Sequence, residues 1–326
     1  MNYRYLGNSG LQVSVLGLGT NAFGKRADEQ TSIDIIHRAL DSGINFIDTA
    51  NIYAGTESER IIGLALAGRR HDAVLATKAG LVREAGRPNA SGSSRRHLMH
   101  ELEGSLKRLK TDYVDLYQIH TFDSRTPLEE TLRALDDMVA SGKVRYIGAS
   151  NYAAWELMKA LGISEAKDWT RFVSMQVSYS LADRTPEQEL VPLCLDQGVG
   201  IIPYFPLAGG ILTGKYGLTA EEAPAGSRVV TDPSFARFLD EGRVALSRQV
   251  NGLAAEIGCS PSSLSLAWLM KQPAVSTVIV GATRTEQLED NLRSAEIELT
   301  PEATDALNDM SEAFRYGKPF ALYRLP

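Results

Sequence analysis

The sequence predicts an α/β fold, a closed parallel (β/α)8 TIM barrel with an N-terminal hairpin and long loops at the carboxyl ends of its strands. Three observations lead to this prediction. Eight short apolar runs alternate with segments of helical periodicity over about 280 residues, the usual length of such a barrel. Three consecutive runs end on polar side chains. A doubly wound open sheet, the competing fold, normally has a glycine-rich loop after its first strand, and the run 15–20 (VLGLGT) lacks that spacing.

Short apolar runs bounded by turn residues give the strand predictions. Two alternating runs around a Gly-Asn-Ser-Gly turn, 3–6 and 11–14, predict the hairpin. The glycines of VLGLGT indicate a close approach of the backbone to a neighbouring group. The eight barrel strands are predicted at 15–20, 44–48, 73–77, 113–119, 144–149, 172–177, 200–204 and 276–280.

Helices are predicted where apolar side chains recur every three or four residues between a capping residue and a stop. The fourth helix begins after Pro127 and ends before Gly142, the usual places for proline and glycine. The stretch 207–240 and the residues after Thr300 do not fit the repeat, and loops of such length are usually functional lids. The predicted helices span 28–40, 58–66, 94–110 (with Ser93 or Ser94 as cap), 127–141, 153–161, 187–196 and 286–295.

The composition excludes several classes of protein. With 44% hydrophobic and 23% charged residues, the 326-residue chain is neither disordered nor fibrous, and we expect a single domain over 1–326. A net charge of −6 without a basic block argues against binding to nucleic acid. No apolar run approaches the ~20 residues that span a bilayer, and the N-terminus lacks the apolar core of a signal peptide. The isolated cysteines, Cys194 and Cys259, predict no metal site, no disulfide and a cytoplasmic location.

Polar side chains follow three consecutive strands of the predicted barrel. Asp48 ends the second strand, with Tyr53 in the loop behind it, and Lys78 and His120 follow the third and fourth strands. Taken alone, Asp48 would be interpreted as the cap of the next turn and Tyr53 as an ordinary half-buried aromatic residue. The two later strand ends favour a functional site, because the carboxyl ends of barrel strands meet at one face.

The chemistry of such a cluster suits proton delivery to a carbonyl group. A tyrosine hydroxyl is a weak acid with a pKa of ~10, and a neighbouring lysine ammonium is expected to lower that pKa. A carboxylate would hold the lysine, and a histidine would donate a hydrogen bond to the carbonyl oxygen. Because the cluster lacks a nucleophile and no side chain supplies hydride, reduction of the carbonyl implies a nicotinamide cofactor. The other histidines, which we expect at the surface, are His37, His71, His97 and His100.

The motifs around these residues resemble those of the aldo-keto reductases over essentially the whole chain. The matching segments are GINFIDTANIYAGTESERIIG, ATKAG, DYVDLYQIH, GKVRYIGASN, MQVSYS, PYFPLAGGILTGKY and VIVGATRTEQLEDNL. The resemblance implies that Tyr53 is the general acid, that Lys78 and Asp48 tune it and that His120 orients the carbonyl. The ILTGKY stretch and the loop after it resemble the bacterial and potassium-channel β-subunit-like branch.

The resemblance also implies a cofactor bound in an extended pose without a Rossmann domain. NADPH/NADP+ is the implied cofactor, with NADH as the alternative. Ser150, Asn151 and Gln176 would hold the carboxamide, and Tyr204 would stack on the nicotinamide ring. The remaining residues that the resemblance places near the cofactor are Gly19, Thr20 and Asp48, together with Pro206, Leu207, Gly209 and Lys215 after the seventh strand.

The adenosine end of the cofactor would lie at residues 281–291. Many relatives have a lysine that pairs with the 2′-phosphate where Gly281 stands here, which weakens the preference for NADPH. Arg284 is close enough in sequence to replace that charge, and a guanidinium suits a phosphate. A plain solvated helix start is the competing interpretation. The other implied residues of this segment are Thr283, Gln287, Asp290 and Asn291.

Two other functions compete with an NADPH-dependent carbonyl reductase. The same fold and cofactor site serve regulatory subunits of the potassium-channel β type, for which the lack of an N-terminal extension is a counter-indication. A barrel isomerase or hydrolase would need a metal cluster or paired carboxylates, and no such spacing is found. The expected partner is a small-molecule carbonyl substrate, with no nucleic acid and no membrane, and a homo-oligomer is compatible with the sequence.

The identity of the substrate cannot be predicted, because loops that vary freely on this fold shape its pocket. The tail KPFALYRLP either folds over the mouth of the barrel or frays, and it carries Phe320, Tyr323 and Arg324. Candidate residues of the substrate site are Phe23, Val82, Arg83, Phe122 and parts of 210–240, beside Tyr53 and His120.

Overall fold

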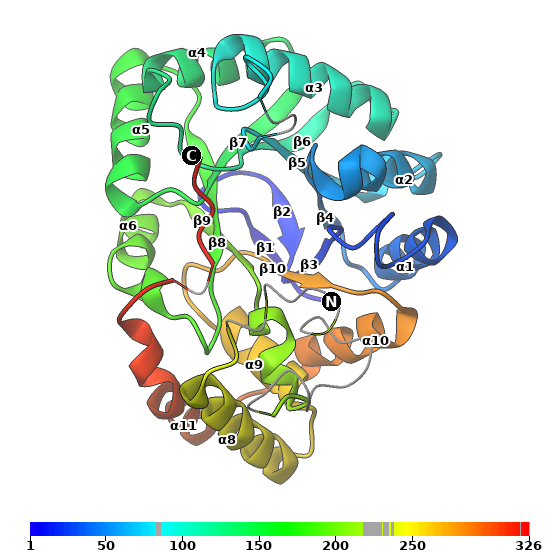
Figure 1. Ribbon diagram of the computed structural model, residues 1–326, viewed down its shortest axis with the longest axis vertical. Coiled ribbons are helices and arrows are strands. Elements are labelled where there is room, and N and C mark those ends of the chain that lie inside the picture. Colours follow the sequence, from blue (N-terminus) through cyan, green and yellow to red (C-terminus); the bar gives the residue numbers. More distant parts are fainter. Residues whose placement is uncertain (83–85, 218–229, 231–234, 236–237, 320, 326) are drawn as a thin grey trace.

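The fold was analysed in a computed structural model that describes residues 1–82, 86–217, 230, 235, 238–319 and 321–325. Eight parallel strands form the barrel in the order β10-β3-β4-β5-β6-β7-β8-β9, and Figure 1 looks along its axis onto the surrounding helices. The predicted barrel is therefore confirmed. The strands are β3 (Leu16–Gly19), β4 (Phe46–Asp48), β5 (Val74–Ala79), β6 (Val114–Ile119), β7 (Val144–Ser150), β8 (Phe172–Ser178), β9 (Gly200–Tyr204) and β10 (Val278–Gly281).

The barrel closes at a seam between β9 and β10. In the part of the chain that the structure describes, one isolated bridge, Ile201–Val275, joins this side of the sheet. Its backbone hydrogen bonds run from Ile201 N to the Ala274 oxygen (2.8 Å) and from Ser276 N to the Ile201 oxygen (3.0 Å). All other neighbouring strands pair over at least three residues, with one bulge at Ile147/Gly148 between β7 and β8, so the seam is the weakest strand contact in the barrel.

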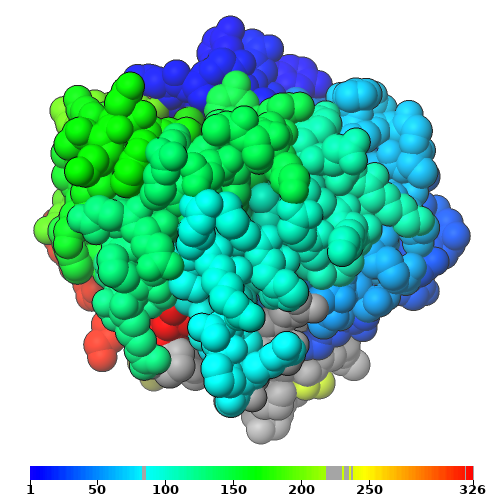
Figure 2. Space-filling model, turned by 90° about the horizontal axis from the view of Figure 1, so that it is seen from above, coloured from blue at the N-terminus to red at the C-terminus, as the bar shows by residue number. Residues whose placement is uncertain are grey.

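The predicted hairpin covers the base of the barrel. It consists of β1 (Tyr3–Tyr5) and β2 (Gln12–Ser14), which pair antiparallel, and in Figure 2 it lies at one end of the molecule (dark blue). Val13 in β2, and Leu6 directly after β1, pack against the apolar residues that fill the barrel. Those residues are Phe46, Val74, Ala76, Leu116, Ile202 and Ile279. The lower part of the barrel interior is thus a packed apolar core, and the polar side chains of the strands lie at the opposite end.

Period-two alternation along the strands places a polar layer directly above this apolar filling. Side chains two residues apart point to the same face of a strand. Phe46, Ala76 and Leu116 lie in the apolar layer, and two residues further on stand Asp48, Lys78 and Gln118. The strand register sets Asp48 beside Ala76 and Lys78 beside Gln118, so the polar side chains converge at the carboxyl end of the barrel.

Helices cover the outer face of the sheet, and many begin at a side chain that caps the first turn. Asp28 accepts from Thr31 N (2.8 Å) at α1, and Ser94, rather than Ser93, caps α3. The helices that follow the strands are α1 (Glu29–Asp41), α2 (Glu57–Ala65), α3 (Arg95–Leu109), α4 (Leu128–Ala140), α5 (Ala154–Lys167), α6 (Leu190–Gln197) and α10 (Thr285–Arg293). Three further helices are α8 (Glu241–Ile257), α9 (Pro261–Met270) and α11 (Pro301–Ser311).

Two helix boundaries differ from the prediction. Helix α5 continues past Gly162 to Lys167, because Ser164 is still buried against the barrel and packing outweighs the poor helix propensity of glycine. Helix α6 begins at Leu190, after a 3-10 turn at Thr185–Glu187. The Glu187 carboxylate binds Arg184, which keeps these residues out of the helix.

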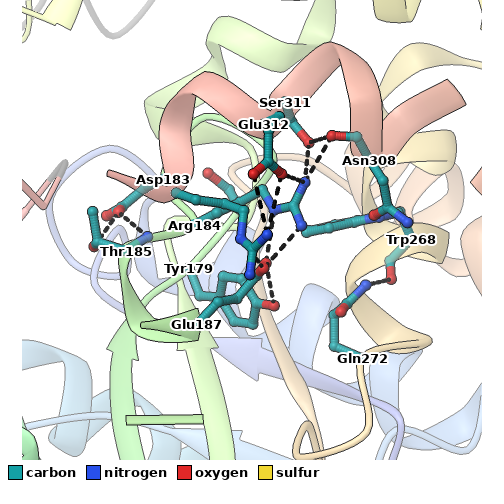
Figure 3. A network of polar contacts seen from close by, with 12 residues as sticks. Tyr179, Asp183, Arg184, Thr185, Glu187, Trp268, Gln272, Asn308, Ser311 and Glu312 are labelled. Carbon is teal, nitrogen blue, oxygen red and sulfur yellow. Dashed lines mark hydrogen bonds and ion pairs between the residues drawn. The ribbon is translucent and has the colours of Figure 1, made fainter. Parts of the chain in front are cut away.

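Segments that are distant in sequence meet around Arg184, a buried residue in the loop after β8. Its backbone N–H donates to the Phe314 oxygen (2.8 Å), and its guanidinium binds the Asn308 oxygen and Ser311 Oγ (2.9 Å each) (Figure 3). Glu187 accepts two hydrogen bonds from the same guanidinium. Helix α11 and the 3-10 turn Glu312–Arg315 are therefore fixed to the carboxyl side of the barrel. Among the described residues, no helix is long and apolar enough to cross a membrane.

Candidate active site

A buried ion pair lies at the centre of the polar layer. Lys78 Nζ donates to Asp48 Oδ1 (2.6 Å) and to the backbone oxygen of Thr49 (2.8 Å). The Lys78 side chain is 0% exposed and that of Asp48 is 4% exposed. Burial lowers the pKa of Lys78, and the attraction of Asp48 opposes that decrease. The two charges can remain buried because each of them is paired and hydrogen-bonded.

The second carboxylate oxygen of Asp48 binds two glutamines. It accepts from Gln118 Nε2 (3.1 Å) and from Gln176 Nε2 (3.0 Å). The amide groups complete the hydrogen bonds of a charge that water does not reach. Gln176 was expected to bind the cofactor carboxamide, whereas its Nε2 donates a hydrogen bond to Asp48 in this structure. Gln118 was not predicted, although a buried polar residue two positions before His120 in an apolar strand is a usable signal.

Tyr53 stands beside this ion pair, at the start of a strained 3-10 turn (Tyr53–Thr56). Its ring centroid is 5.2 Å from Lys78 Nζ and 6.0 Å from the His120 ring, which it meets edge-on. The turn behind it has left-handed backbone angles at Ala54 (φ 50°) and Thr56 (φ 91°). Such conformations cost on the order of 1–3 kcal/mol each and cluster at functional sites. The strained turn places the Tyr53 ring against Lys78 and His120.

The environment raises the pKa of Tyr53 well above 10.0. The causes, in order, are burial, the negative charge of Asp48 and the neighbouring Tyr323. The expected decrease of this pKa is therefore wrong in this structure, because burial and the negative charge of Asp48 dominate the surroundings of the phenol. Tyr53 consequently stays protonated at neutral pH.

His120 follows β6 directly, as predicted, and is 5% exposed. Burial and then the positive charge of Lys78 lower its pKa well below 6.5, so the imidazole is neutral at neutral pH. Its Nδ1 has no hydrogen-bond partner among the described residues. Of the four histidines expected at the surface, His97 is buried (1% exposed) because it lies in the first turn of α3, under the barrel loops, so that expectation is wrong for His97.

The next strand end brings together an amide, a hydroxyl and a phenol. Asn151 has a left-handed backbone (φ 57°) and its Nδ2 donates to the His120 oxygen (2.9 Å) and to Ser150 Oγ (3.0 Å). Its Oδ1 accepts from the Tyr204 hydroxyl (2.7 Å). The amide group of Asn151 is thereby held in one orientation, with its oxygen directed at Tyr204.

The groups at the end of the first barrel strand, β3, already have partners within the protein. Thr20 is fully buried, and its hydroxyl donates to the Asp48 backbone oxygen (2.9 Å) and accepts from Ser58 Oγ (2.8 Å). The Ile279 side chain fills the space beside Gly19, where an added Cβ would come within 2.5 Å of it. The group expected near these glycines is therefore at least in part a neighbouring strand of the barrel.

The loop after β9 begins with a left-handed residue, Phe205 (φ 53°), and continues into a 3-10 segment, Ala208–Thr213. Pro206 is buried and Leu207 is half-buried. Gly209 has a φ of 68°, which a residue with a side chain rarely adopts. Lys215 is exposed, with its Nζ 5.1 Å from the Tyr216 ring centroid. The residues 218–229, 231–234 and 236–237 of the expected lid lie outside the described residues.

In the segment expected to hold the adenosine end of the cofactor, helix α10 begins without a side-chain cap. Arg284 stands at its N-cap with a 67% exposed side chain, 3.9 Å from Glu286. Gln287 Oε1 accepts from Thr283 N (2.8 Å) and Thr283 Oγ1 (3.0 Å), which orders the turn. An uncapped helix N-terminus with an exposed guanidinium suits an anion.

Two other predicted residues of this segment make contacts within the protein. Asn291 Nδ2 donates to the Gly281 oxygen (3.4 Å), and an added Cβ at Gly281 would meet nothing within 4 Å. Asp290 Oδ2 accepts from Ser260 Oγ (3.2 Å), and its backbone oxygen accepts from Ser263 Oγ (3.0 Å). The serines, which were not predicted, attach α9 to α10.

The candidate substrate residues are spread over different environments. Phe23 is fully buried in the core, so its side chain presents no surface to a substrate in this structure. Val82 is 41% exposed, and Phe122 packs edge-on against Tyr152 and Trp155. The tail crosses the barrel mouth, with the Tyr323 ring 6.1 Å from that of Tyr204. Arg83 and Phe320 lie outside the described residues.

The site has the parts for acid–base chemistry at a carbonyl oxygen. It combines a protonated phenol, a neutral imidazole and a buried ion pair that keeps positive charge close to both. Within the ranges that the structure describes, no group of three or more His, Cys, Asp or Glu side chains is arranged to hold a metal ion. Cys194 is buried, and burial raises its pKa to about 12, which makes it a poor nucleophile.

Comparisons with known proteins agree with this arrangement. The model of the Aldo/keto reductase family matches residues 15–312. The chain is 41% identical to the uncharacterized oxidoreductase YrpG of Bacillus subtilis, over 95% of this chain and 96% of that protein. It is 37% identical to a probable voltage-gated potassium channel subunit beta of Oryza sativa, over 98% of each chain. It is 35% identical to the versiconal hemiacetal acetate reductase of Aspergillus parasiticus, over 95% of this chain and 96% of that protein.

Proposed function

The chain belongs to the aldo/keto reductase family, and from this premise we propose that it is an NADPH-dependent oxidoreductase that reduces an aldehyde or ketone to the alcohol. One observation carries the proposal. Tyr53, His120 and the Asp48–Lys78 pair lie together at the carboxyl end of the barrel, with the phenol protonated and the imidazole neutral. A protonated acid and a neutral hydrogen-bond donor suit a carbonyl oxygen that gains negative charge.

The side chains around this centre fit a nicotinamide cofactor. The amide oxygen of Asn151 is held in a fixed position and accepts a hydrogen bond from the Tyr204 hydroxyl. An amide oxygen is the kind of acceptor that the NH2 group of a carboxamide needs. The uncapped start of α10 and Arg284 would hold the phosphate of the adenosine end. When bound, the cofactor supplies hydride to the carbonyl carbon.

The residues of the chain then account for the proton and the orientation of the substrate. Tyr53 holds the proton that the carbonyl oxygen receives. His120 donates a hydrogen bond to the same oxygen and keeps it within reach of the phenol. Lys78 stabilises the phenolate that remains after proton transfer, because its ammonium lies next to the Tyr53 ring, and Asp48 keeps that ammonium in place.

The test is a panel of aldehydes and ketones assayed with NADPH and NADH. We expect NADPH consumption with a reactive aldehyde such as a nitrobenzaldehyde. Tyr53→Phe, which keeps the ring and removes the proton, is expected to lower reduction by ~10²–10⁴-fold and leave cofactor binding intact. The matched control is Tyr316→Phe, because the Tyr316 side chain is 64% exposed and the substitution removes the same hydroxyl from the surface.

The same panel decides between an enzyme and a regulatory subunit. The similarity to potassium channel β subunits supports the second role. If the protein binds NADPH but consumes none of it with any carbonyl compound, the regulatory role is favoured. If Tyr53→Phe reduces aldehydes at the parent rate, the assignment of the acid is wrong even where turnover is observed.

A further inference from the structure

The C-terminal tail, residues 321–325, is attached to three separate parts of the barrel: the end of β9, the loop after β6 and the first turn of α5. The Ala321 oxygen accepts from the Tyr204 hydroxyl (3.0 Å), and the Tyr323 oxygen accepts from Thr121 Oγ1 (2.7 Å). Arg324 Nη1 binds both carboxylate oxygens of Glu156 (2.8 and 3.1 Å). Figure 1 shows this tail (red) running over the strands toward α5. The tail therefore lies across the face that carries the candidate active site.

The start of the tail is fixed independently of these contacts. The buried Arg184 network of Figure 3 ties α11 and the turn Glu312–Arg315 to the loop after β8. Gln188 Nε2 also donates to the Arg315 oxygen (2.6 Å). Because the chain enters the mouth from an anchored point, docking of 321–325 depends on its own few contacts. One of them involves Tyr204.

The hydroxyl of Tyr204 has two acceptors and one proton. It lies 2.7 Å from Asn151 Oδ1 and 3.0 Å from the Ala321 oxygen. A phenol donates once, and neither a side-chain nor a backbone carbonyl oxygen can donate in return. Asn151 cannot turn its NH2 toward Tyr204, because Nδ2 is engaged by the His120 oxygen and Ser150 Oγ. The Tyr204 hydroxyl can therefore make a full hydrogen bond to only one of these two oxygens at a time.

The two acceptors belong to different functional parts of the molecule. Asn151 is the residue that would receive the NH2 of the cofactor carboxamide, and Ala321 is part of the tail. An NH2 that donates to Asn151 Oδ1 weakens that oxygen as an acceptor for the Tyr204 proton, because it uses one of the two lone pairs. The proton then favours the Ala321 oxygen, and the hydrogen bond to the tail becomes stronger.

We propose that Tyr204 is a positioning residue that couples occupation of the Asn151 amide site to docking of the C-terminal tail. This inference rests on the proposed function, since it needs a nicotinamide cofactor. The coupling is reciprocal: if the cofactor strengthens the tail contact, the docked tail strengthens cofactor binding by the same factor. The net worth of one hydrogen bond sets that factor at about three- to tenfold.

The first test measures binding of NADP+ by calorimetry, without any turnover. We expect a chain that ends at Pro319 to bind NADP+ about three- to tenfold more weakly than the parent. In Tyr204→Phe, which keeps the ring but has no proton to share between the two acceptors, the same shortening should leave NADP+ binding unchanged. Arg324→Gln, which loosens the tail without shortening it, should likewise weaken binding in the parent and not in Tyr204→Phe. The matched control is Arg315→Gln, which leaves the tail contacts of 321–325 in place.

The second test follows docking of the tail itself. Trp155 lines a surface cavity of about 250 Å³ together with Arg324 and Leu325, so its emission reports on the tail. With NADP+, which does not absorb tryptophan emission, the unmodified protein should show a shift that is absent in Tyr204→Phe. Trp155→Phe identifies the source of the signal among the three tryptophans.

The outcomes separate this inference from the proposed function. If the unmodified protein fails to bind NADP+ or NADPH, the proposed function is wrong and the coupling falls with it. If shortening the chain leaves NADP+ binding unchanged in the parent, the coupling alone is overturned. It is also overturned if shortening weakens binding in Tyr204→Phe as much as in the parent, or if Tyr204→Phe shows the full shift of Trp155.

Discussion

Replacing Lys78 by methionine is the most direct test of how the buried polar layer is held together. Methionine preserves most of the length of the side chain and removes its charge. The Asp48 carboxylate then keeps only the two amide donors of Gln118 and Gln176. The Thr49 oxygen also loses its donor. Since Asp48 is 4% exposed, water cannot replace the ammonium.

The expected loss follows from the cost of an unpaired buried charge. Removing one partner of a buried ion pair lowers the free energy of unfolding by about 3–5 kcal/mol. For a chain of this length, the unfolding entropy of roughly 2.1 cal/mol/K per residue converts that loss into a decrease in Tm of about 4–7 °C. The double variant Lys78→Met/Asp48→Asn carries no buried charge, and the Asn amide can donate to the Thr49 oxygen. It should lie within about 1–2 kcal/mol of the parent.

Urea unfolding followed by circular dichroism measures these differences. Lys143→Met serves as the matched control, because the Lys143–Glu103 pair has the same chemistry but side chains that are 44% and 51% exposed. Its effect should stay below about 1 kcal/mol. If the double variant loses as much stability as the two single variants added together, the ion pair is not what stabilises the layer, and the reasoning is refuted.

Three further predictions concern charge and pH. Arg284→Ala should weaken NADPH binding by ~10-fold and leave NADH binding nearly unchanged. Calorimetry measures both affinities, and Arg293→Ala on the same helix is the control. Equal affinity of the parent protein for NADPH and NADH would contradict this prediction. Because the pKa of His120 is lowered in the folded state, unfolding takes up a proton, so stability should fall below pH 6.5 by up to about 1.4 kcal/mol per pH unit. His120→Gln should remove that part of the slope in pH-dependent urea titrations, and an unchanged slope would show that other groups cause it. Since the pKa of Tyr53 is raised above 10.0, kcat/KM for carbonyl reduction should stay constant up to about pH 9. The rate of alcohol oxidation, which needs the ionised phenol, should rise with pH. A fall in the rate of reduction near neutral pH would point to another acid.

The barrel was predictable because its signals are local. Apolar runs of strand length and turn residues gave β3 to β10 within one or two residues, and the family assignment is confirmed by the match over residues 15–312. Helix α9 was missed for a physical reason. Its residues Ser262–Met270 are buried on every side, so the helix has no polar face and no amphipathic period. Helices α8 and α11, which were also missed, lie in or next to the regions that the repeat could not explain.

The candidate site was predictable in composition but not in its connections. Strand ends identified Asp48, Lys78 and His120, since the carboxyl ends of barrel strands meet. The sequence does not show that burial, and then the charge of Asp48, raise the pKa of Tyr53 instead of letting Lys78 lower it. Long-range hydrogen bonds such as Tyr204 to Ala321, 117 residues apart, leave no periodic trace in the chain.

The single bridge at the seam of the barrel bears on how this fold can change over evolution. The chain between β9 and β10 contains the longest connection, and its two ends are held at the seam by Ile201 and Val275. Lengthening a flexible connection costs little entropy, roughly 0.6 kcal/mol for each doubling. Insertions there leave the registers of the other seven strand pairs untouched, because those pairs do not depend on the seam. The connection between β9 and β10 is thus where insertions, including ones that alter the substrate site, can occur without changing the strand pairing of the barrel.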